Sequence, residues 1–244
     1  KRMRSKFQDT KARHPMINYR GSEASRIDNL TDAVFGIAIT LLIFNLENPN
    51  SFETLLQFTQ TLPAFLISIA FVVLIWKEHL NFSRVYAFND AWLLVINTFF
   101  IGLVIFYVYP LRFLTIFLTN FFFGSHVDLG LSAAEIPDLM IYYGSIATAL
   151  YLLLFMFHLR AWRIKEKLGL NDFEQWFTKR QLARLSIMFA VPLASVIVVL
   201  SFKGQSIAWA AILGGMTYNL YVPGMVIWAR HFKKANAHWQ DPQA

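Results

Sequence analysis

Residues 26–48 read RIDNLTDAVFGIAITLLIFNLEN, a stretch that begins with two polar turns and continues as an apolar run. From Ala33 to Phe44 the run carries no charge, and Thr40 is its one polar side chain. About 20 residues are enough for an α-helix to cross a hydrocarbon core of about 30 Å. The stretch therefore predicts the first membrane-spanning helix of the chain.

A helical projection of this stretch groups several residues on one face. Because successive residues of a helix turn by about 100°, that face holds Ala33, Ile37, Thr40, Leu41, Phe44 and Asn48. An apolar stripe broken by one threonine fits the lining of a narrow pore. It fits a helix packed inside a membrane protein equally well, and the periodicity does not choose between them.

The composition indicates a membrane protein. Of the 244 residues, 56% are hydrophobic and 24 are phenylalanine, which is more large apolar surface than a water-soluble domain needs. The basic, polar start of the chain has no apolar run, so we expect no cleavable signal peptide. Since the chain has no cysteine, disulfides and thiolate metal sites are excluded.

Six hydrophobic segments follow one another along the chain, so the predicted fold is all-α, with six transmembrane helices. Each is long enough to span a membrane, and they lie at 30–47, 60–80, 91–120, 136–160, 182–202 and 206–229. We expect the third to leave the membrane near Tyr109 and Pro110, because proline interrupts a helix. The aromatic residues that follow, 111–124, would lie at the interface or continue as a tilted end. The charged segment 161–180 is expected to be a loop at the membrane surface with helical pieces.

The basic residues predict the orientation. Of the 22 lysines and arginines, only Arg112 and Lys203 fall outside the N-terminal segment, the second and fourth connections and the C-terminal tail. Basic residues gather on the cytoplasmic side of membrane proteins, so both termini are predicted to be cytoplasmic. The net charge of +7 then reflects the basic residues of the cytoplasmic segments, which argues against nucleic-acid binding. Three regions are expected: a basic N-terminal segment (1–25), a six-helix domain (26–230) and a C-terminal tail (231–244).

Catalytic patterns are missing from the sequence. The six histidines form no HExxH-like pair, no glycine-rich phosphate loop is present, and the few carboxylates lie mostly in predicted loops. An enzyme is therefore disfavoured, and no cofactor is expected.

Two aspartates stand at the start of the first helix. Asp28 and Asp32 either cap this helix and oppose its dipole, or mark a functional interior. Because Asp32 faces away from the Ile37 stripe, we favour a packing role over ion binding, with Trp76, His79 and Asn97 as its candidate partners. Two roles are also open for Thr40. Its hydroxyl either donates a hydrogen bond to a carbonyl of the preceding turn, or it forms part of a ring of hydroxyls around a symmetry axis.

The first helix resembles that of a known family. Arg26-x-x-x-Leu30-Thr31-Asp32 is similar to the R-x-x-x-F-S-D signature of the lysosomal-type potassium channels, the transmembrane protein 175 family, although Leu30 replaces Phe and Thr31 replaces Ser. The likeness extends over residues 26–112 and includes Trp76, His79, Asp90, Asn97 and the Tyr109-Pro110-Leu111 exit.

The resemblance implies a potassium-permeable cation channel without a re-entrant selectivity filter. The first helix would line the pore, with an apolar constriction at Ile37, with Thr40, Leu41 and Phe44 continuing outward and with K⁺ passing close to Thr40. A single six-helix repeat implies a homotetramer in the plasma membrane of a prokaryote, with lipid and other copies of the chain as its partners. A packing network would hold the pore helix; its members would be Arg26, Leu30, Thr31, Asp32, Trp76, His79 and Asn97.

Two other functions stay open on the sequence alone. A secondary or proton-coupled ion transporter normally shows internal repeats and ionisable groups at the membrane midplane, and the midplane of this chain is almost without charge. A non-conducting membrane scaffold would also fit six helices.

Overall fold

The computed structural model describes residues 14, 16–21, 25–44, 51–123 and 129–236, except for the side chains at 43, 44, 53, 54, 57, 58, 121–123 and 234–236. This part of the chain is all-α, as predicted. Its helices are α1 (Arg26–Phe44), α2 (Phe52–Gln60), α3 (Leu62–Tyr86), α4 (Ala91–Phe123), α5 (Ile136–Arg163), α6 (Asp172–Lys203), α7 (Ile207–Thr217) and α8 (Tyr221–Asn236). Two short 3₁₀ turns, η2 (Ala133–Glu135) and η3 (Tyr218–Leu220), precede α5 and α8.

Five helical stretches are long and apolar enough to cross a membrane. They are Leu62–Tyr86, Ala91–Asn120, Ala133–Arg163, Asp172–Lys203 and Ile207–Lys233. Together with the 19-residue α1 they make the six helices that the hydrophobic segments predicted. The sixth is not a single α-helix, because η3 separates α7 from α8.

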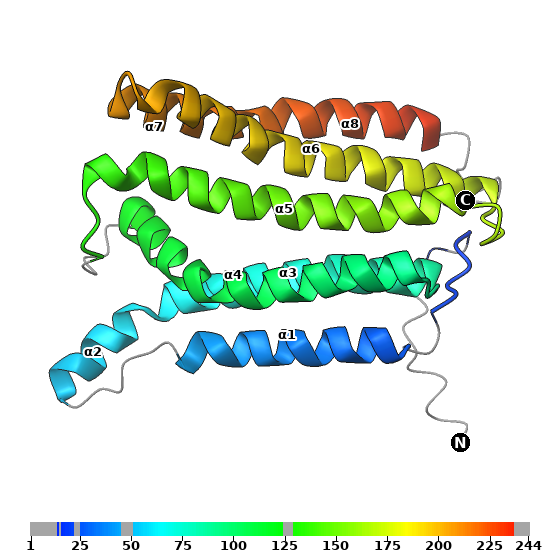
Figure 1. Cartoon of the computed structure of the whole chain (residues 1–244), viewed down its shortest axis with the longest axis horizontal. Helices are drawn as coiled ribbons and strands as arrows, with labels where there is room; N and C mark the ends of the chain where they lie inside the picture. The colour runs from blue at the N-terminus through cyan, green and yellow to red at the C-terminus, as the bar shows by residue number, and fades with distance from the viewer. Residues whose placement is uncertain (1–13, 15, 22–24, 45–50, 124–128, 237–244) are drawn as a thin grey trace.

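Three local features add to the sequence-based expectation or differ from it. The helix α4 continues through Pro110 to Phe123 and bends along its course, so the residues after the proline extend the third predicted span as a tilted end (Figure 1). The expected surface loop 161–180 shrinks to residues 164–171, because α5 runs to Arg163 and α6 begins at Asp172. Asn171 starts α6 with a capping box, in which its side chain accepts a hydrogen bond from the Glu174 backbone N–H. Residues 52–60 form α2, a helix that the hydrophobicity pattern did not predict.

The helices lie side by side in layers (Figure 1). α1 occupies one edge of the bundle and packs against α3 and α4, while α5 joins this group to α6, α7 and α8. One face of α1 is buried in this arrangement through Val34, Phe35, Ala38 and Leu42, none more than 8% exposed. The pore-helix candidate is therefore held from one side only.

A short segment ahead of α1, residues 16–21, ties two distant helices together; we call it the N-terminal strap. The backbone N–H of Asn18 and the guanidinium of Arg20 donate hydrogen bonds of 2.8–3.0 Å to the carboxylate of Glu174 at the start of α6. Glu174 is fully buried. At the other end of the strap, the Gly21 N–H donates to the Arg84 carbonyl in the last turn of α3. The strap thus fixes the chain just before it enters α1.

Candidate functional site

One stripe of α1 faces away from the bundle. Arg26, Leu30, Ala33, Ile37 and Thr40 follow one another at helical spacing, and all five are exposed. Leu30 is 54% and Ile37 is 56% exposed, although both are large apolar residues. In a helix of this hydropathy, such a stripe must be covered by lipid, by another copy of the chain or by a narrow pore.

The predicted lining residues do not all lie on this stripe. Ile37 and Thr40 do, but Leu41 is half-buried and packs against the hydrophobic core. The side chain of Phe44 lies outside the described residues. The Thr40 hydroxyl donates to the Gly36 carbonyl over 2.9 Å, which is the back-bond expected of threonine in a membrane helix. Its hydrogen is therefore directed at the helix, and the oxygen lone pairs stay free on the exposed side.

On the side of α1 that faces the bundle, a series of hydrogen bonds connects side chains of three helices, and each side chain donates to the next. Thr31 donates to the Ile27 carbonyl at 2.9 Å, so its oxygen is free to accept from the Asn97 amide N–H, also at 2.9 Å. The Asn97 carbonyl oxygen then accepts from Nε2 of His79 at 3.0 Å. All three side chains are buried, and the His79 ring stacks on Phe100. This series joins α1, α4 and α3 through residues that the sequence had grouped together.

Asp32 makes a separate contact from the exposed side of α1. Its carboxylate accepts a 2.7 Å hydrogen bond from the Trp76 indole N–H of α3. The two remaining members of the predicted network, Arg26 and Leu30, lie on the exposed stripe and are not brought to this cluster within one chain. The described residues contain no group of three carboxylates or histidines that could hold a metal ion.

Asp28 has a role that sequence reasoning only partly anticipated. It forms a reciprocal cap with Ser25: the Asp28 N–H donates to the serine hydroxyl, and the Ser25 N–H donates to the carboxylate. The spacing of the pair is a readable N-terminal signal. The same carboxylate accepts a 2.5 Å bond from the Ser83 hydroxyl of α3, 55 residues away, and no local pattern predicts that contact.

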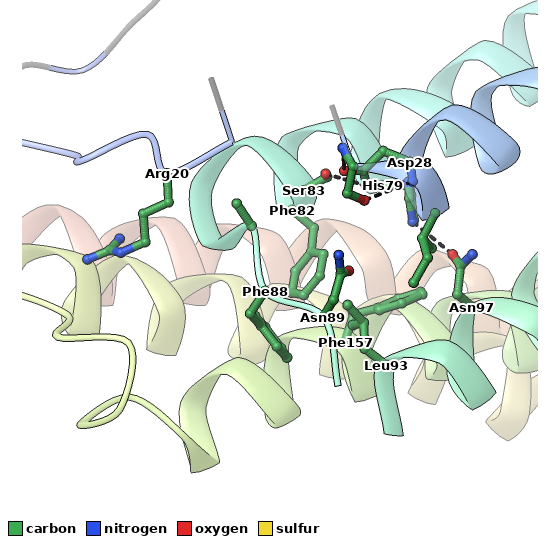
Figure 2. A pocket seen from close by; sticks show the side chains of 13 residues that line it. Arg20, Asp28, His79, Phe82, Ser83, Phe88, Asn89, Leu93, Asn97 and Phe157 are labelled. Carbon is green, nitrogen blue, oxygen red and sulfur yellow. Dashed lines mark hydrogen bonds between the residues drawn. The ribbon is translucent and has the colours of Figure 1, made fainter. Parts of the chain in front are cut away.

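A cavity of about 150 Å³ lies behind the first turn of α1 (Figure 2). Asp28, Ser83, His79 and Asn97 line its polar part, and the phenyl ring of Phe157 closes another side. Because Ile27 and Asp28 are the α1 residues that line it, the cavity lies on the bundle side of the helix and not on the exposed stripe.

The chain is similar to known proteins over nearly its whole length. A family model described as endosomal/lysosomal potassium channel TMEM175 matches residues 26–108. A protein of Marivirga tractuosa named "Potassium channel" is 33% identical over 248 residues, which cover 98% of this chain and all of that protein. A crystal structure of a variant of the potassium channel MtTMEM175, in complex with a nanobody-MBP fusion protein, has a TM-score of 0.81 and 33% sequence identity, covering 91% of this chain and 99% of that one.

Proposed function

The chain belongs to the TMEM175 family of potassium channels, and on that premise we propose that K⁺ crosses the membrane along the exposed stripe of α1. The protein is a multi-pass membrane channel and not an enzyme. What supports the proposal most directly is the contrast between the two faces of α1. One face is locked to α3 and α4, and the other presents Ile37 and Thr40 outward.

Ile37 is the proposed constriction. Its side chain is 56% exposed, and Ala33, the stripe residue one turn before it, is small. When several copies of such a residue close around an axis, water leaves the narrow apolar ring and an ion there loses hydration that nothing replaces. A tilt or rotation of α1 that separates these side chains readmits water and opens the path.

Thr40 is the proposed ligand of the passing ion. Because its hydroxyl hydrogen is engaged with Gly36, the oxygen presents lone pairs to the stripe side, as a K⁺ ligand must. One turn from Ile37, such oxygens replace part of the hydration that the constriction removes. This supports modest selection of K⁺ over Na⁺, with Leu41 and Phe44 at the outer border of the path.

A stripe on one helix needs several copies to surround a pore. The chain holds one α1, at the edge of its bundle, so we propose a homotetramer with the four α1 helices around the axis. The bacterial relative supports a prokaryotic plasma membrane, and the lysine and arginine distribution supports both termini in the cytoplasm. Residues 1–25 and 231–244 would then be cytoplasmic segments flanking the six-helix channel domain.

The experiment that tests the pore is K⁺ flux into liposomes containing the purified channel. Ile37→Asn places a polar group in the constriction and should raise the K⁺ flux at least several-fold, because water then stays in the constriction. The matched control is Ile197→Asn on α6, a residue of the same type that is 55% exposed and far from α1 along the bundle. Equal flux from wild type and Ile37→Asn, in protein shown to be folded, would move the constriction elsewhere.

A further inference from the structure

A second feature lies at the other edge of the bundle, away from α1. Aromatic and basic side chains meet where the end of α5, the start of α6 and the end of α8 come together. We call it the basic–aromatic cluster; its members are Trp162, Lys165, Trp176, Lys179, Arg180 and Trp228. None of them belongs to the stripe, the strap or the hydrogen-bond series described above.

Two lysine ammonium groups lie over the same tryptophan ring in this cluster. Nζ of Lys165 lies 4.4 Å and Nζ of Lys179 lies 5.0 Å from the centroid of Trp162. Both positive charges lie against this one ring, so an anion bound beside it would be attracted by both. Yet the ion pairs among the described residues engage the basic groups of Arg20, Arg160, Arg184 and Lys203, and neither of these lysines.

Arg180 is held between two further indoles. Its guanidinium carbon is 5.6 Å from the Trp176 centroid and 4.9 Å from the Trp228 centroid, and the Trp228 indole N–H donates to the Arg180 carbonyl. Among the described side chains, Nε of Arg180 and Nε1 of Trp176 are buried donors without an acceptor. Such donors are costly to leave unpaired, so the cluster combines three unpaired cations with two unsatisfied N–H groups.

The level of the cluster along the helices points to the kind of acceptor. The uncharged run of α6 begins at Leu185, only five residues after Arg180, and continues to Phe202. Arg180 therefore stands about two turns or less outside the apolar part of the bundle, at the depth of lipid headgroups. Tryptophan concentrates at that depth, and Ile227, next to Trp228, is an apolar side chain that is 67% exposed.

We propose that the basic–aromatic cluster binds the phosphodiester of an anionic glycerophospholipid. Lys165, Lys179 and Arg180 supply the positive charge, and the phosphate oxygens accept from the donors that lack a partner within the chain. Basic pockets between membrane helices bind acidic headgroups in this way. Exposed apolar residues of α6 and α8, such as Ile197 and Ile227, offer a surface for acyl chains, which favours a lipid over a soluble anion.

The test is thermal unfolding of the purified full-length channel in neutral detergent, with phosphatidylglycerol, phosphatidylcholine or glycerol phosphate added. We expect phosphatidylglycerol to raise the unfolding temperature by several degrees, because it binds only the folded protein. The Lys165→Gln/Lys179→Gln variant should lose most of this rise. The control Lys77→Gln/Lys167→Gln removes the same charge from exposed positions outside the cluster and should keep it.

Three outcomes would overturn the proposal. The first is that phosphatidylglycerol raises the unfolding temperature of wild type and of the Lys165→Gln/Lys179→Gln variant equally. The second is an equal rise with phosphatidylcholine, since the charge would then be irrelevant. The third is that glycerol phosphate alone raises the unfolding temperature as much as phosphatidylglycerol does, which would make the cluster a site for soluble phosphate. Native mass spectrometry of the same three proteins counts the retained phosphatidylglycerol independently of stability, and no readout depends on ion flux.

Discussion

The side chains of Asn97 and Thr31 are joined by a 2.9 Å hydrogen bond that connects α4 to α1 at a fully buried position. Because Asn97 also accepts from His79 of α3, one amide fixes α1 against both helices on which it rests. The contact lies about 120° around α1 from Ile37, on the side that faces the bundle. The rotational setting of the proposed pore stripe is therefore decided by a polar contact that no permeating ion touches.

Thr31→Val should destabilise the protein while Thr40→Val should not. The two substitutions are identical in shape and lie on the same helix, but Thr31 is buried and accepts from Asn97, whereas the Thr40 hydroxyl bonds only its own helix. Leaving the buried Asn97 N–H without an acceptor costs about 1–3 kcal/mol. Thermal unfolding in detergent measures both variants, and equal unfolding temperatures would remove Thr31 from the group of residues that hold α1.

Thr40→Ala should lower the permeability of K⁺ relative to Na⁺. The substitution removes the oxygen proposed to replace lost hydration, and a differential loss of about 1 kcal/mol corresponds to about a fivefold change in the ratio. Reversal potentials under bi-ionic conditions give this ratio. Thr40→Val, which keeps the volume, should change it as well; if only the alanine variant differs, the size of the residue matters and its oxygen does not.

Glu174→Gln should loosen the N-terminal strap. The carboxylate is fully buried and receives hydrogen bonds from Asn18, Arg20 and the Asn171 N–H, so its charge is matched by Arg20 alone. Breaking one side of a fully buried ion pair costs about 3–5 kcal/mol, and we expect a smaller loss here because the remaining charge, on Arg20, is partly exposed to solvent. We expect a lower unfolding temperature and faster tryptic cleavage after Arg20.

The exposed Glu166, in the connection just before α6, provides the control for this experiment, since Glu166→Gln removes the same charge at an exposed position. The double variant Arg20→Met/Glu174→Gln should be less destabilised than the sum of its single changes. Additive losses would mean that the two side chains do not stabilise each other.

Gly21→Ala should displace the strap from α3. A methyl group at this position would lie 2.6 Å from the Ser83 carbonyl oxygen and 2.9 Å from the Arg84 Cα, and these backbone atoms cannot move aside cheaply. Gly204→Ala is the control, because nothing stands within 4 Å of the added carbon there. Limited trypsin digestion compares the two: the first should be cut within the strap many times faster, and equal rates would show that the strap tolerates the shift.

Much of the candidate site could be predicted from residues close together in sequence. The 3.6-residue period of α1 placed Ile37 and Thr40 on one side, and both are exposed there. The Thr40 back-bond also follows from local geometry, since its acceptor Gly36 lies one turn earlier. The same helical projection placed Leu41 on that face, but neighbouring helices leave this residue only partly exposed.

The sequence by itself determined six apolar helices, their order and the placement of Ile37 and Thr40 on one face of α1, because hydropathy and helical period are properties of neighbouring residues. Only the tertiary structure decided which polar groups meet. Thr31 finds Asn97 across 66 residues, and Arg20 finds Glu174 across 154. In a membrane protein, apolar residues facing lipid and apolar residues facing another helix look alike in sequence. Burial and polar pairing are therefore set by how the helices pack, which no local pattern records.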